Sequence, residues 1–185
     1  MSAALHERLR AICQTPSPPG LGPGPRAGVT AEPDLRAQFA ALAREFHPDS
    51  RRADLFLGSL LWWHDHLEAT HALAQSIPDA DGSYLHALMH RREPDYANAA
   101  YWFRRAGQHP VCQPLGTAGR DWLQARSESE TATRLLHGGR WDSLAFLELC
   151  ATAAREPESA PRHRLARALQ QLEFEVWLRW LCGVA

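Results

Sequence analysis

Apolar residues recur at helical spacing along most of the chain, and short polar turns separate the runs. The clearest run covers residues 57–77 and ends at Pro78, Asp79 and Gly82, because proline and glycine interrupt helices and aspartate favours turns. We therefore predict one continuous helix over 57–77. Its apolar positions are Leu57, Leu60, Leu61, Leu67, Leu73 and Ala74.

Two further helices are predicted directly after this turn, from Ser83 to Arg92 and from Tyr96 to Ala106. The residues between them contain Pro94, which disfavours helical geometry in the residue that precedes it. Additional amphipathic stretches predict helices over 2–13, 35–46, 141–154 and 164–182, and one that begins near 117 or 121 and breaks around 127–129.

These elements predict an all-α fold, an irregular array of antiparallel helical hairpins closed by the C-terminal helix over 164–182. Residues 15–34 are too rich in proline and glycine to fold alone. We therefore divide the chain into an N-terminal helix with a Pro/Gly-rich strap or linker, residues 1–34, and a single helical domain, residues 35–185.

The segment DYANAAYWFRRAGQHP, which ends at Pro110, resembles the second half of a tetratricopeptide repeat, in which small residues let paired helices approach closely. The longer segment LHALMHRREPDYANAAYWFRRAG resembles the signature of a family of small bacterial and fungal helical proteins. Glycine is usual in that family where this chain has Pro94. The resemblance covers residues 57–110 and implies tetratricopeptide-like hairpins without implying a particular activity.

Charge and cysteine usage narrow the class of protein. The 20 basic and 21 acidic residues nearly balance and form no basic patch, so we expect no nucleic-acid partner. No apolar stretch has the length of a signal peptide or of a membrane span. The four cysteines are scattered without metal-type spacing, which favours reduced, buried thiols in a cytoplasmic protein. They are Cys13, Cys112, Cys150 and Cys182.

Histidines and glutamates suggest a site on the helices around the turn near Ala80. Residues four and seven positions apart share a helix face, which groups His64 with Glu68 and His71, and His86 with His90 and Glu93. Folding the helices antiparallel places His71 opposite His90 or Met89. Imidazole and carboxylate ligands suit zinc, iron, nickel or manganese. The candidate metal ligands are Glu68, His71, His86 and His90, with His64 and Glu93 in support.

Three interpretations of these histidines remain open: hydrogen-bonded structural residues, ligands of a divalent metal or small molecule, and a metal-free acid–base site. The first favours a helical-repeat module that binds a protein or peptide partner in a groove. The second favours a metal- or ligand-binding protein, a class that includes metal-dependent enzymes. We expect a monomer or a homodimer, since an exposed apolar C-terminal helix would favour self-association.

Overall fold

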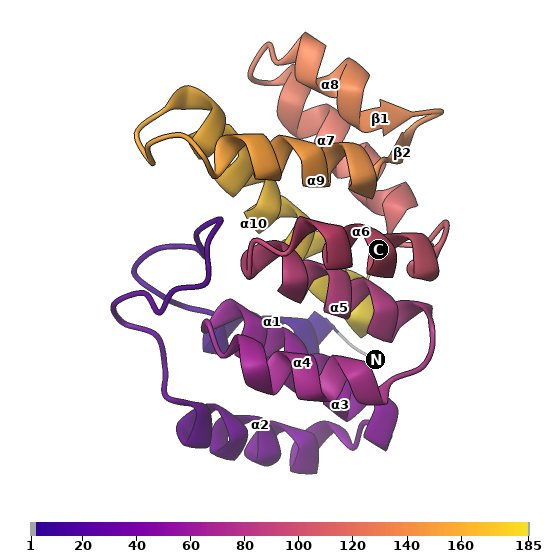
Figure 1. The fold of residues 1–185 in the computed structure, drawn as a ribbon. Coiled ribbons are helices and arrows are strands. Elements are labelled where there is room, and N and C mark those ends of the chain that lie inside the picture. Colours follow the sequence, from indigo (N-terminus) through magenta and orange to yellow (C-terminus); the bar gives the residue numbers. More distant parts are fainter. Residues whose placement is uncertain (1–2, 185) are drawn as a thin grey trace.

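The computed structural model describes residues 3–184 (Figure 1). Within them the chain forms ten helices and one two-stranded ribbon, so the all-α fold class is confirmed. The helices are α1 (Ala3–Ile12), α2 (Glu32–Phe46), α3 (Ser50–Trp63), α4 (Leu67–Ser76), α5 (Ala80–Arg92), α6 (Tyr96–Ala106), α7 (Cys112–Gln124), α8 (Ser129–Leu135), α9 (Ser143–Ala153) and α10 (Pro161–Cys182). In the ribbon, β1 (Leu136–His137) pairs antiparallel with β2 (Arg140–Trp141).

Consecutive helices pack as pairs that are stacked from α2 at one end of the molecule to α8 at the other (Figure 1). Three pairs, α3–α4, α5–α6 and α7–α8, share one turn geometry. The turn residue has a positive φ, at Asp65, Pro94 and Ser127. The next residue donates its amide to a carbonyl five positions earlier: His66 to Leu61, Asp95 to His90 and Glu128 to Leu123, at 2.9–3.0 Å. This is the hydrogen bond of a Schellman helix end.

The predicted single helix over 57–77 is wrong, because the chain turns between Trp63 and Leu67. Asp65 adopts the left-handed conformation there, and its buried carboxylate accepts hydrogen bonds from Arg26 and Arg92. These partners come from distant parts of the chain. The periodicity of residues 57–77 therefore contains no sign of the break that they stabilise.

Helix α7 also begins earlier than predicted, at Cys112, and includes residues that the sequence suggests are irregular. Its glycines serve close packing. A Cβ atom on Gly116 would lie 2.3 Å from the carbonyl oxygen of Gly139, and one on Gly119 would lie 2.9 Å from the Trp141 ring. The helix therefore needs these glycines in order to lie against the ribbon. The predicted break near 127–129 is confirmed, between α7 and α8.

The C-terminal helix α10 packs against α1, α3, α7 and α9. Trp177 on this helix is fully buried; its ring stacks on Tyr84 at 5.2 Å between centroids, and its indole N–H donates to Ser59 at 2.9 Å. Trp180 is 36 % exposed. Most of the apolar surface of α10 is thus buried within the array. No helix in residues 3–184 is both long and apolar enough to cross a membrane.

The proline- and glycine-rich strap between α1 and α2 lies against the helices and is held there by polar contacts to its backbone. Arg167 and Gln170 of α10 donate to strap carbonyls, as does Arg92 of α5. Leu21 is 3 % exposed and belongs to the same hydrophobic core as Leu5 and Leu9 of α1. The accepting carbonyls are those of Pro18, Pro19, Gly20 and Gly22.

Candidate metal centre

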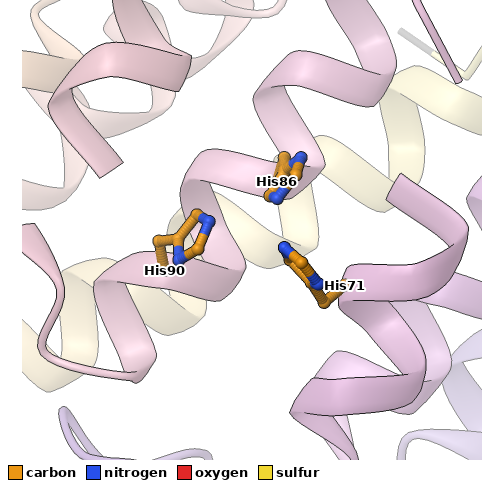
Figure 2. A group of neighbouring side chains, drawn as sticks. All are labelled: His71, His86 and His90. Carbon is orange, nitrogen blue, oxygen red and sulfur yellow. The ribbon is translucent and has the colours of Figure 1, made fainter. Parts of the chain in front are cut away.

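Three histidine side chains converge between α4 and α5 (Figure 2). His86 and His90 are one helical turn apart and share a face of α5, and His71 reaches toward them from α4. The ring centroids lie 4.6 Å apart for His71–His86, 4.8 Å for His86–His90 and 5.3 Å for His71–His90. One nitrogen from each ring lies within 4.8 Å of the other two.

The local sequence explains why these rings meet. Asp79 caps α5 by accepting a hydrogen bond from the Gly82 amide at 3.1 Å, which fixes where the helix begins. The link from Ser76 to Ala80 is short, so α4 and α5 must lie side by side. Of the two residues predicted to lie opposite His71, His90 and Met89, His90 is in ring contact with it, at 5.3 Å between centroids.

His86 is the most deeply buried of the three, at 1 % exposure. Neither of its ring nitrogens has a hydrogen-bond partner among the described residues. Trp102 of α6 stacks on the ring at 3.9 Å between centroids and covers one face. Burial is the main cause that lowers the pKa of His86, and the neighbouring His90 and His71 add to it. Together they bring this pKa to about 3. The ring is therefore neutral at pH 7, with a lone pair available to a ligand.

His90 is oriented by a carboxylate. Its Nδ1 lies 3.1 Å from Oε2 of Glu93, one turn further along the chain. Burial lowers the pKa of His90 even though Glu93 acts in the opposite direction. With Nδ1 donating to the carboxylate, Nε2 is left as the lone-pair nitrogen, which is the arrangement that commonly surrounds a metal-bound histidine.

His71 is half-buried and belongs to the more open side of the cluster. Its ring meets His86 and His90 edge-on, with interplanar angles of 76° and 71°. The cluster therefore has a closed side, formed by His86 and Trp102, and a side that solvent can reach at His71.

The other candidate ligands lie elsewhere. Glu68 is exposed on α4 and contributes no atom to the cluster. His64 follows α3 and does not share a helix with Glu68 and His71. Its Nδ1 accepts the Thr30 amide at 3.0 Å and its Nε2 donates to the Ile12 carbonyl at 2.9 Å, so it fastens the strap. Glu93, which the sequence groups with His86 and His90, contacts His90 and contributes no atom to the cluster itself.

Trp102 is a contributor that sequence reasoning did not assign to the site. Arg105, one turn further along α6, places its guanidinium over the indole at 5.2 Å from the ring centroid. His86 and Trp102 each lie eight residues from Pro94, so counting outward from that turn could have placed them opposite each other. The helix pattern alone does not separate it from the exposed Tyr101.

The donor set restricts which ions fit. Three neutral imidazoles suit zinc, nickel, copper or iron and disfavour magnesium and calcium, which prefer oxygen ligands. A tetrahedral zinc ion with Zn–N bonds of about 2.0–2.1 Å holds its ligand nitrogens roughly 3.3 Å apart. The three nitrogens lie within 4.8 Å of one another, so the rings would have to move closer together around the ion.

No family model matches this chain, and neither the curated proteins nor the solved structures contain a significant match to it.

Proposed function

We propose that this protein binds a first-row divalent transition metal, best suited to Zn²⁺, through His71, His86 and His90. The observation that carries the proposal is the burial of both His86 nitrogens without a partner beside two other imidazoles. A buried polar group without a hydrogen bond costs about 1–3 kcal/mol. Coordination by one nitrogen would offset that cost, whereas a structural histidine would normally have a hydrogen-bond partner.

The arrangement also suggests what the ion would do. It would join α4 to α5, two helices that belong to different hairpins, and so would stabilise their packing. Three protein ligands leave a fourth position for water or a small ligand, as in catalytic zinc sites. His71 lies on the accessible side, where such a ligand would enter. Metal-dependent catalysis is therefore part of this proposal, with the reaction left open.

Isothermal titration of the chelator-treated full chain with ZnCl₂ tests the proposal. We expect binding of one ion, no measurable binding by His86→Ala or His90→Ala, and binding weakened about 10- to 100-fold by Glu93→Gln, which removes the carboxylate behind His90. His137→Ala is the matched control, because the His137 side chain on β1 is 65 % exposed and lies outside the cluster. Circular dichroism checks that each variant folds. Equal binding by wild type and the triad variants, or none by wild type, would contradict the proposal.

We propose as a second function that the hairpins form a tetratricopeptide-like array that binds a protein or peptide partner. Three turns of the same geometry, about 30 residues apart, support the repeat. Tyr101 supports a partner surface, since it is 53 % exposed on α6. A photo-crosslinking residue at position 101 should capture one defined protein in native cells, and the same residue at exposed Glu158 should not. No capture at either position, or equal capture at both, would count against a partner surface at Tyr101.

A further inference from the structure

A cavity of about 830 Å³ lies away from the histidine cluster, between the start of α3, the middle of α7 and the end of α10. Its volume is in the range of small-molecule sites, about 300–1,000 Å³. Much of its wall is apolar, and Trp180, one of two exposed large hydrophobic residues in the described chain, stands at its edge. The apolar wall comes from Leu55, Pro114, Ala118, Val176, Leu181 and Val184.

Charged groups line one part of the cavity. They are Arg51, Arg52, Arg179, Asp81 and Asp121. An apolar chamber with a few charged groups in its wall favours a ligand with an apolar body and one charged end.

One acid of this group, Asp81, is already engaged by other side chains of the protein. Asp81 accepts hydrogen bonds from Arg51 and, at 2.8 Å, from His109. Although burial raises the pKa of Asp81, these two donors outweigh it and hold the pKa well below its usual range. Arg51 is bonded to Asp79 as well. Arg51 and Asp81 therefore neutralise each other and leave little capacity for a ligand.

Arg52 differs from Arg51. Within residues 3–184 its guanidinium has no hydrogen-bond or ion-pair partner, and only its backbone amide is bonded, to Asp49. It stands in the first turn of α3, where the helix dipole adds positive potential and normally favours acidic residues. A guanidinium forms two parallel hydrogen bonds with a carboxylate, which makes Arg52 a suitable partner for one such group.

We propose that this cavity binds a small amphipathic carboxylate of the fatty-acid type, with its alkyl chain against Val176 and Leu181 and its carboxylate on Arg52. The inference is independent of the proposed metal centre, because none of the three histidines lines the cavity. A single guanidinium without a partner suits a head group with one charge better than a multiply charged phosphate.

The test is calorimetric titration of the full chain with decanoate, decan-1-ol and decyltrimethylammonium. The two ionic probes are kept below their critical micelle concentrations, and decan-1-ol is kept below its solubility limit. We expect decanoate to bind one to one and the two other probes to bind at least about tenfold more weakly, since neither can form a charge-assisted hydrogen bond with the Arg52 guanidinium. Equal binding of all three probes, no binding of decanoate, or binding to anionic vesicles without binding of free decanoate would overturn the proposal.

Variants locate the site. Arg52→Gln should weaken decanoate at least about tenfold and leave decan-1-ol unchanged, whereas Arg8→Gln, a matched exposed arginine on α1, should change neither. Ala118→Phe, on the partly exposed face of α7, should fill the chamber and remove binding of both, with circular dichroism confirming the fold. Zn²⁺ binding should be unaffected in every variant. Decanoate affinity that survives both Arg52→Gln and Ala118→Phe would overturn the proposal without bearing on the metal centre.

Discussion

At the scale of single residues, the chemistry of the candidate metal centre depends on the burial of His86. Trp102 covers one face of the ring, while His71 and His90 lie beside it. Desolvation disfavours the imidazolium form, and two further imidazoles disfavour it again. The same packing that removes water from His86 therefore keeps it neutral and able to coordinate a metal.

This burial predicts a pH dependence of stability in the metal-free protein. The pKa of His86 is about 3 when folded and 6.5 in its ordinary state, so the unfolded chain takes up a proton more readily. The contribution of His86 to stability should be full above about pH 6.5, should fall as the pH drops toward 3, and should change no further below that. The other titrating groups are present in both wild type and His86→Phe. The difference in pH dependence of unfolding free energy between the two proteins therefore reports the contribution of His86.

Urea unfolding of wild type and His86→Phe from pH 7.5 to pH 4, with a chelator present, measures the effect. We expect the unfolding free energy of wild type to fall more steeply than that of the variant as the pH is lowered. Parallel curves would show that His86 is not held neutral by its surroundings.

At the scale of elements, sequence reasoning located the turns that are made by local chemistry. The α5–α6 turn follows from Pro94, and the α4–α5 turn from Pro78 and the capping Asp79. It missed the α3–α4 turn, because Asp65 is held by Arg26 and Arg92, whose contacts depend on tertiary structure. With that turn unrecognised, His64 was assigned to the wrong helix face.

The three equivalent turns yield a prediction for Pro94. At the other two, Asp65 donates its amide to Trp62 and Ser127 donates to Gln124. Proline has no amide hydrogen and its ring confines φ to about −65°, yet Pro94 has a φ of +31°. Glycine would remove the strain and supply the missing donor.

Pro94→Gly should therefore raise the free energy of unfolding by about 1–2 kcal/mol, since relief of backbone strain exceeds the added entropy of the unfolded chain. Pro157→Gly, in the loop between α9 and α10 where no positive φ is required, is the control and should be neutral or slightly destabilising. Chemical denaturation of both variants measures the difference. A loss of stability in Pro94→Gly equal to that of the control would contradict the assigned turn geometry.

At the scale of the whole molecule, contacts between neighbours in sequence were predictable and distant ones were not. Counting outward from one turn placed His71 opposite His90 or Met89, because two helices joined by a short link must pair. The attachment of the strap to α10, through Arg167 and Gln170, joins residues about 150 positions apart. Hydrophobic periodicity carries no information on such pairings. The same holds for the buried ion pair of Arg91 with Glu173, which lies 82 positions further along the chain.

The proposed metal centre also acts at this scale, because its histidines come from two hairpins. A bound ion would therefore link α4 to α5. The most direct test is anomalous X-ray diffraction from crystals of the full chain loaded with Zn²⁺, measured on both sides of the zinc absorption edge. We predict one strong anomalous peak at about 2.0–2.1 Å from one nitrogen each of His71, His86 and His90. A peak only at surface histidines, or three histidines without a peak between them, would contradict the proposal.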